Sequence, residues 1–294
     1  MAIPRLNNII RVLESGGIPV TTFVSPPTVE NAIALSQTTY DGIVFESEHH
    51  PYDITTLRDC LQYMLNRRQI VERNTLASAV TPLIRIPPNG GELSQWCAKQ
   101  VLDIGAYGVV WPHVSTADEA YNAVSACRYP RPKSAAASEP AGQRGDSPAA
   151  AARYWGLTPQ EYYAKADTWP LNPSGEILVM IMCEDVQAID NLPEILGVPG
   201  IGVVLIGEGD LSQNLGYPRQ YEHPAVLEAM TTIRRICAEH KVPCGHPHVD
   251  AHNVGRIIAE GYRFLMTAPV RSYAGLDACR QAISKNVTEE SAAR

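Results

Sequence analysis

The feature that most constrains this chain is an alternation of short apolar runs with segments of helical period. Eight runs rich in Val, Ile, Leu and Phe indicate strands, and helix-like segments separate them. Their apolar residues are nearly continuous, which is typical of parallel strands covered on both faces. The predicted strands span residues 19–25, 41–47, 82–87, 108–114, 176–184, 202–210, 242–249 and 263–270.

Eight strand–helix units in 294 residues predict a TIM (β/α)8 barrel, in one domain covering residues 1–294. The alternative is an open doubly wound sheet, although no GxGxxG stretch follows the first predicted strand. An amphipathic helix is expected before the barrel, ending at Gly16–Gly17. The remaining predicted helices span residues 28–37, 53–69, 91–103, 116–127, 185–196, 224–240, 251–260 and 273–285.

Residues 128–175 interrupt this rhythm between the fourth helix and the fifth strand. The first part is rich in Ala, Ser and Pro, and the second part carries aromatic residues in a helical pattern. Long connections of this kind are usually functional or disordered. We expect a mobile insertion at 133–142 and helical cover over the barrel mouth at 149–168.

Composition argues against several classes of partner. The formal net charge of −7 gives no overall electrostatic support for binding nucleic acid or an anionic membrane. No apolar run approaches the roughly 20 residues that span a bilayer, and residues 1–16 lack the layout of a signal peptide. The seven cysteines form no CxxC pair, so we expect reduced, buried thiols in a cytoplasmic protein.

Polar residues gather where the predicted strands end. In a TIM barrel these ends line the active site. They carry Glu46, Glu48, His49, His50, Arg85, His113, Glu184, Glu208, Asp210, His246 and His248. This convergence of acids, bases and a cation predicts a catalytic site at the mouth.

Glu184 and Asp210 each end a strongly apolar run, one strand–helix unit apart. Neighbouring carboxylates repel unless one is protonated or a cation lies between them. Oxygen ligands favour a hard divalent ion, here Mg²⁺ or Mn²⁺, with Co²⁺ as a further candidate. The alternative interpretation is that both carboxylates cap the segments that follow them.

Arg85 lies in an otherwise apolar strand, where a buried guanidinium needs an anionic partner. That partner is either a substrate oxyanion or a structural carboxylate on a neighbouring strand.

The histidines give weaker signals. His49 and His50 point opposite ways on extended backbone, so at most one faces the mouth. Glu46, three residues before His49, is a candidate to orient its ring. His246 and His248 are two residues apart and can face one side of a strand, where they line the substrate pocket, pack against neighbours or form a competing metal site.

Six motifs in a fixed order resemble the HpcH/HpaI aldolase family, the class II pyruvate aldolases, over residues 5–285. The more specific two are IGEGDLSQNLG at 206–216 and GAYGVVWPHV at 105–114. The others are ExEHxPxD at 46–53, RIP at 85–87, RYP followed by GxRG at 128–145, and the glutamate at 184.

The resemblance implies a barrel of the phosphoenolpyruvate/pyruvate type and a lyase acting on 4-hydroxy-2-oxo acids through a metal-bound pyruvate enolate. Glu184 and Asp210 would hold the metal, and backbone amides around Gly209 and Asp210 would hold the substrate carboxylate. Arg85 would stabilise the enolate oxygen, and His49 would transfer protons beside Glu46. The implied partners are pyruvate plus an aldehyde, in a homo-oligomer that is usually a hexamer in this family.

Several residues depart from the family pattern. Glu46 replaces an aspartate, Met182 replaces a glutamine, and Glu208–Gly209 replaces a Pro-Ala pair. The ending LMTAPVRSY at 265–273 is also unusual. We therefore expect the metal and enolate machinery to be kept and the aldehyde pocket to be remodelled.

Two other functions stay open. The same enolate would serve an oxaloacetate decarboxylase of the macrophomate-synthase kind or a citryl-CoA-lyase-like enzyme, although no Lys/Arg cluster marks these loops for CoA phosphates. A barrel that binds a 2-oxo acid without turnover is the third, and the joint presence of His49, Arg85, Glu184 and Asp210 disfavours it.

Overall fold

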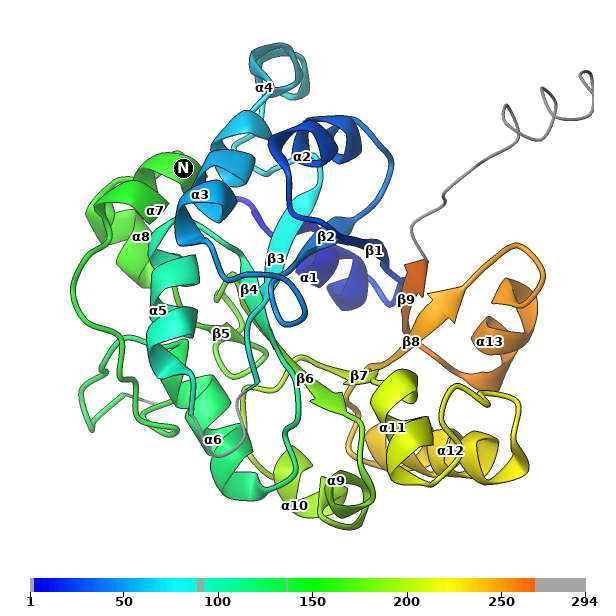
Figure 1. The fold of residues 1–294 in the computed structure, drawn as a ribbon. Coiled ribbons are helices and arrows are strands. Elements are labelled where there is room, and N and C mark those ends of the chain that lie inside the picture. The colour runs from blue at the N-terminus through cyan, green and yellow to red at the C-terminus, as the bar shows by residue number, and fades with distance from the viewer. Residues whose placement is uncertain (1–2, 89–92, 136, 268–294) are drawn as a thin grey trace, which may run out of the picture.

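The fold is a closed ring of parallel strands surrounded by helices (Figure 1). A computed structural model describes residues 3–88, 93–135 and 137–267, in which pairing of β4 with β6 closes the ring. The ring strands are β1 (Val20–Val24), β2 (Gly42–Glu46), β3 (Thr81–Arg85), β4 (Gly108–Trp111), β6 (Ile177–Cys183), β7 (Val203–Ile206), β8 (Cys244–Val249) and β9 (Phe264–Thr267). The predicted (β/α)8 barrel is confirmed, and the open sheet is wrong.

A two-residue strand, β5 (Thr168–Trp169), pairs with the start of β6 and was not predicted. All residues of β2, β3, β4, β6 and β7 are buried, which explains their nearly continuous apolar sequence. The six cysteines in the described part of the chain are buried free thiols, as expected. Within that part, no helix is long and apolar enough to cross a membrane.

Helices follow the ring strands in the predicted order. They are α1 (Asn8–Glu14), α2 (Val29–Ser36), α3 (Ile54–Tyr63), α4 (Arg67–Arg73), α5 (Gln95–Asp103), α6 (Ala117–Ala126), α7 (Ala149–Trp155), α8 (Pro159–Lys165), α9 (Val186–Asp190), α10 (Leu192–Leu196), α11 (Glu208–Asn214), α12 (Pro224–Glu239) and α13 (Val254–Glu260). The predicted helix at 273–285 and the end of the strand at 263–270 lie outside the described residues.

Side-chain caps decide several boundaries that the sequence placed differently. Asn66 caps α4 and so divides the helix predicted at 53–69. A capping box formed by Thr116 and Glu119 begins α6, with Glu119 accepting the Thr116 N–H.

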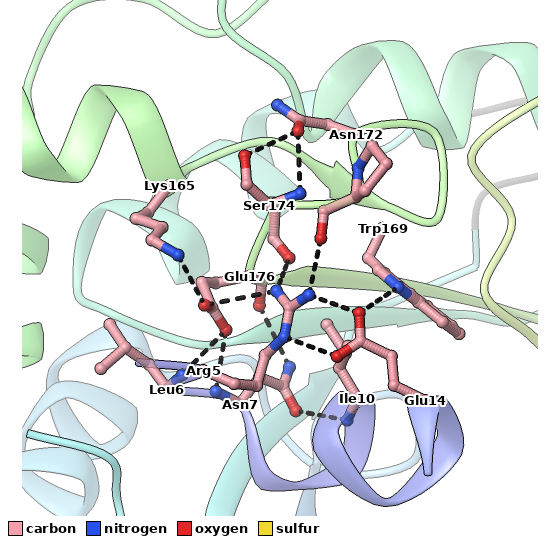
Figure 2. Close-up of polar contacts among 12 residues, drawn as sticks. Arg5, Leu6, Asn7, Ile10, Glu14, Lys165, Trp169, Asn172, Ser174 and Glu176 are labelled. Carbon is pink, nitrogen blue, oxygen red and sulfur yellow. Dashed lines mark hydrogen bonds and ion pairs between the residues drawn. The ribbon is translucent and has the colours of Figure 1, made fainter. Parts of the chain in front are cut away.

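The amino-terminal end of the barrel is closed by a buried carboxylate, Glu176, at the start of β6 (Figure 2). Glu176 Oε2 accepts the backbone N–H groups of Leu6 and Asn7, at 3.1 and 2.9 Å. Its Oε1 lies 3.3 Å from the Arg5 guanidinium and 3.4 Å from Lys165 Nζ. Both oxygens therefore have partners, and they tie the segment before α1 to the sheet.

The long connection from 128 to 167 is anchored by Arg128, whose side chain is fully buried. Its guanidinium donates to Asp167 and to the carbonyl oxygens of Ala137 and Pro140, each at 2.6 Å. The mobility proposed for residues 133–142 stays a prediction.

The helical cover expected at 149–168 is present as α7 and α8, but it does not lie over the mouth. Trp155 Nε1 donates to the Gly105 carbonyl, and its ring stacks on Tyr107 at 4.4 Å, just before β4 begins. The two helices therefore pack at the amino-terminal end of the barrel, because their aromatic residues find an apolar wall there.

Candidate active site

Glu46 and Arg85 meet at the carboxyl ends of β2 and β3, where the strand register pairs them directly. Glu46 Oε2 bonds Arg85 Nη2, while Oε1 accepts the backbone N–H groups of Glu48 and His49 at 2.6 and 3.0 Å. The predicted contact between Glu46 and the His49 ring is therefore wrong. Glu46 instead fixes the loop backbone and the guanidinium, because its carboxylate is directed across the sheet to β3.

Arg85 is buried between two carboxylates. Its Nη1 lies 2.9 Å from Glu48 Oε2 and 3.6 Å from Met182 Sδ, and the guanidinium carbon lies 4.5 Å from the centre of the Phe23 ring. Its Nε is buried and has no hydrogen-bond partner among the described residues. The structural ion pair is thus present, and one buried N–H remains for a further acceptor.

Glu48, which the sequence suggested only as a structural residue, contacts Arg85 and two histidines. It lies 3.6 Å from His49 Nε2 and 3.4 Å from His113 Nε2, and its side chain is almost fully buried. Burial acts to raise its pKa, but the His113 hydrogen bond and Arg85 outweigh this and leave the pKa below its ordinary value. Glu48 is therefore an ionised link between a cation and two imidazoles.

His113 follows β4 in a left-handed backbone conformation, with φ of 52°. Its ring is 39% exposed, and the hydrogen bond to Glu48 raises its pKa to about 9, helped by Glu184 and opposed by burial. Its backbone N–H donates to Glu184 Oε1 at 2.5 Å. The strand-end position of His113 was visible in the sequence, but its bond to Glu184 depends on this turn of the backbone.

Glu184 ends β6 with its side chain 1% exposed. Its Oε1 has the His113 N–H, whereas Oε2 is buried without a hydrogen-bond partner in the described part of the chain. A Cβ at Gly207 would overlap Oε2, so glycine at that position is what leaves room for the carboxylate. Burial raises the pKa of Glu184 to about 7, and nearby Glu48 and Asp210 act in the same direction.

Asp210 and Gly209 lie in the first turn of α11, not at the end of a strand as predicted for 202–210. The strand β7 ends at Ile206 because Gly207 allows the chain to turn and the acidic residues favour a helix start. The N–H groups of a first helical turn have no intrahelical partners. Asp210 is near enough to Glu184 to help raise its pKa, and the expectation that the two carboxylates share one ion stays a prediction.

A divalent ion fits this pair. A buried carboxylate oxygen without a partner, with a second carboxylate near enough to act on its pKa, is a local excess of negative charge that a hard cation would neutralise. No group of three or more His, Cys, Asp or Glu side chains in residues 3–88, 93–135 and 137–267 has metal-binding geometry. Two protein carboxylates, completed by substrate oxygens and water, suit Mg²⁺, which usually keeps several non-protein ligands.

His246 and His248 face elsewhere. They line a cavity of about 250 Å³ with Glu208, Tyr221 and Tyr262, and neither Glu184 nor Asp210 contributes to it. His248 Nδ1 bonds Glu208, and the two rings lie against Tyr262 and Tyr221. The pair is therefore placed outside the carboxylate site, because Cys244, His246 and His248 alternate onto the helix-facing side of β8.

The two adjacent histidines also separate. His49 presents a 63% exposed ring beside Glu48, whereas His50 Nε2 lies 2.8 Å from Ser25 Oγ at the end of β1. The His49 ring is thus exposed beside Glu48, and His50 joins two strand ends.

Comparisons with known proteins give the family. The family model described as HpcH/HpaI aldolase/citrate lyase matches residues 22–268. A 2-keto-3-deoxy-L-rhamnonate aldolase from Escherichia coli O157:H7 is 37% identical over 78% of this chain and 74% of its own length.

Solved structures share the fold. An HpcH/HpaI aldolase/citrate lyase family protein from Burkholderia cenocepacia J2315 superposes with a TM-score of 0.74 at 24% identity, covering 95% of this chain and 98% of its own. Macrophomate synthase superposes with a TM-score of 0.69 at 22% identity, covering 97% and 90%. With the motif order, the closed barrel and the two carboxylates at its mouth, the match over most of the chain shows that this protein belongs to the HpcH/HpaI aldolase/citrate lyase family.

Proposed function

We propose that this protein is a metal-dependent lyase that cleaves 4-hydroxy-2-oxo acids to pyruvate and an aldehyde, and joins them in reverse. The observation that carries this proposal is buried Glu184, whose Oε2 has no hydrogen-bond partner among the described residues and whose pKa nearby Asp210 helps to raise. The curated relatives, named for a 2-keto-3-deoxy sugar acid, favour substrates of that class.

Glu184 and Asp210 would hold the ion, which we propose is Mg²⁺ or Mn²⁺. A divalent ion held there would supply Lewis-acid chemistry toward the 2-oxo acid. The N–H groups of Gly209 and Asp210 lie in the first turn of α11, and they would receive the substrate carboxylate.

Arg85 stabilises charge on the substrate oxygen. Cleavage of C3–C4 leaves its electron pair on the pyruvate fragment as an enolate, and an Arg85 N–H favours that oxyanion. Glu46 and Glu48 hold the guanidinium from both sides, so it is fixed before the charge develops.

His49 moves the proton. Its exposed ring accepts the proton of the 4-hydroxyl as the aldehyde forms, and a proton returned to C3 completes pyruvate. Glu48, 3.6 Å from His49 Nε2, positions this ring. We therefore assign to Glu48 the positioning role that the sequence gave to Glu46.

Two further proposals concern the cellular location and the assembly of the protein. We propose that the protein works in the cytoplasm, where thiols stay reduced, and as a homo-oligomer, which sedimentation velocity would measure directly.

The reaction is tested by offering purified protein a panel of 4-hydroxy-2-oxo acids and oxaloacetate with Mg²⁺, Mn²⁺ or Co²⁺, and following pyruvate. We expect pyruvate release from the hydroxy acids. EDTA should abolish this release, and Asp210→Ala should remove it. Release that EDTA leaves intact would contradict the metal mechanism. Pyruvate from oxaloacetate alone would indicate a decarboxylase, and binding without turnover would indicate a 2-oxo acid-binding barrel.

A further inference from the structure

A second cavity lies at the amino-terminal end of the barrel, away from the carboxylates. It has a volume of about 230 Å³ and is formed by α4, the segment 75–80 that leads into β3, and the end of α7. Figure 1 shows α4 projecting beyond α3 at the edge of the molecule, on the side that also carries α2. Val80 lines this cavity at one end of β3 and Arg85 lies at the mouth, so roughly 15 Å of strand separates the two sites.

The walls of the cavity are mainly apolar. Its inner side consists of buried Met64, Tyr107 and Trp155. Its outer side consists of Ile70 and Leu76, which are 45% and 47% exposed. Exposed aliphatic side chains that line a concavity gain when an apolar group covers them.

The polar part of the lining is positive. Arg73 and Arg153 both line the cavity, and none of its described lining residues is acidic. Arg153 bonds only the neutral Gln62, at 2.8 Å, and Arg73 has no hydrogen-bond or ion-pair partner in the described part of the chain. By contrast, Arg68 on the same helix pairs with Glu72 at 2.6 Å and lies outside the cavity. Two guanidiniums without a carboxylate form a receptor for an anion.

Two hydroxyl groups in the wall are also left without partners. Ser78 Oγ and Tyr154 Oη are buried and have no hydrogen-bond acceptor or donor among the described residues. Tyr154 is 5% exposed, and both residues line the cavity. A buried hydroxyl is unfavourable until it is paired, so a small movement that brings either group to a bound polar atom is favoured.

We propose that this cavity binds a small amphipathic carboxylate, with its hydrocarbon part between Leu76 and Trp155 and its carboxylate at Arg73 and Arg153. The volume is below that of pockets for drug-sized ligands, which run from roughly 300 Å³ upward, so the ligand is a short chain. The site is independent of the aldolase reaction, because none of these residues reaches the mouth.

The test uses octanoate as the probe, with octanol as its neutral match, and titrates each into the full-length protein by calorimetry. We expect saturable octanoate binding, and affinity lower by about tenfold or more in Arg73→Gln/Arg153→Gln, since charge-assisted hydrogen bonds are lost. Arg68→Gln removes a guanidinium from the same helix but not from the cavity, and should leave octanoate affinity unchanged. Pyruvate release in the absence of octanoate should be the same in all three proteins.

Other results would overturn the proposal. Equal affinity for octanol and octanoate would show that the arginines recognise nothing, and absence of octanoate binding would show that the cavity is not such a site. Sedimentation distinguishes a further case: if Leu76→Asp dissociates an oligomer while octanoate does not bind, the apolar rim is a contact between copies. Loss of aldolase activity alone, with octanoate binding intact, would bear on the mouth and not on this cavity.

Discussion

Two buried glutamates at opposite ends of β6 have opposite surroundings. Glu176, at the amino-terminal end, has partners on both oxygens, from two backbone N–H groups, Arg5 and Lys165 (Figure 2). Glu184, at the carboxyl end, has one N–H on Oε1 and nothing on Oε2 among the described residues. Burial raises the pKa of both carboxyl groups.

The difference shows that burial alone does not distinguish a glutamate that stabilises the fold from one that serves the functional site. The Glu176 carboxylate pairs with groups of the segment that closes the barrel, so removing it should lower the free energy of unfolding. Glu184 keeps an oxygen without a hydrogen-bond partner in the described part of the chain. Its burial should therefore lower the stability of the fold, while that oxygen remains available to bind a ligand. The following predictions test that division, from the largest effect to the smallest.

Glu184→Gln should lower turnover by about a thousandfold or more, since a catalytic metal ion supplies several kcal/mol and each 1.36 kcal/mol is tenfold in rate. It should also stabilise the metal-free protein above pH 7. The folded pKa of about 7 exceeds the unfolded value of 4.5, so the native state loses stability as pH rises between them. Turnover and urea unfolding at pH 8 measure both effects, and a large loss of stability would break the comparison.

Glu176→Gln should lower the free energy of unfolding by roughly 3 kcal/mol, because Arg5 and Lys165 lose a buried carboxylate partner. Turnover per folded molecule should stay within about twofold, since the change lies far from the reacting atoms. Glu14→Gln is the matched control, because Glu14 also binds Arg5 but is 38% exposed. Equal losses of unfolding free energy in the two variants would show that buried Glu176 contributes no more to stability than exposed Glu14.

Glu48→Gln should lower turnover by roughly 10- to 100-fold and lower the pKa of His113 from about 9 toward its ordinary value. The hydrogen bond to Glu48 is the largest cause of that raised pKa. An NMR titration of the His113 ring measures the shift. Glu46→Gln is the control, because Glu46 contacts Arg85 and not His113, so it should leave the His113 pKa in place.

Metal affinity should fall by about tenfold per pH unit below pH 7, because Glu184 must lose its proton to bind the ion. Above pH 7 the affinity should level off. Calorimetry in buffers of different ionisation enthalpy counts the protons released. Affinity that is constant from pH 5 to 8 would mean that Glu184 is not a ligand.

The barrel was readable from the sequence because each strand buries both faces and so carries a local apolar signature. Glu184, Arg85 and Asp210 were found because strand ends converge in any such barrel. Their partners could not be predicted, because the contacts of Glu48 with His49 and His113 depend on side-chain directions that neighbouring strands fix. The turn at Gly207 was missed because the apolar run before it gives no sign of where β7 stops.

The side on which the two histidines of β8 lie could not be predicted for a related reason. Their two-residue spacing predicted a shared face but not which one, and His246 and His248 face the helices. A period of two cannot tell the inside of a barrel from its outside.

Arg128 donates to Asp167 and to the carbonyls of Ala137 and Pro140, so it holds the chain on both sides of residues 129–135. Lys133 is exposed and lies between these anchors, so the contacts of Arg128 do not require chain continuity there. This is where a circular permutation should open new termini, or where a reporter peptide should be inserted, at the least cost to the barrel.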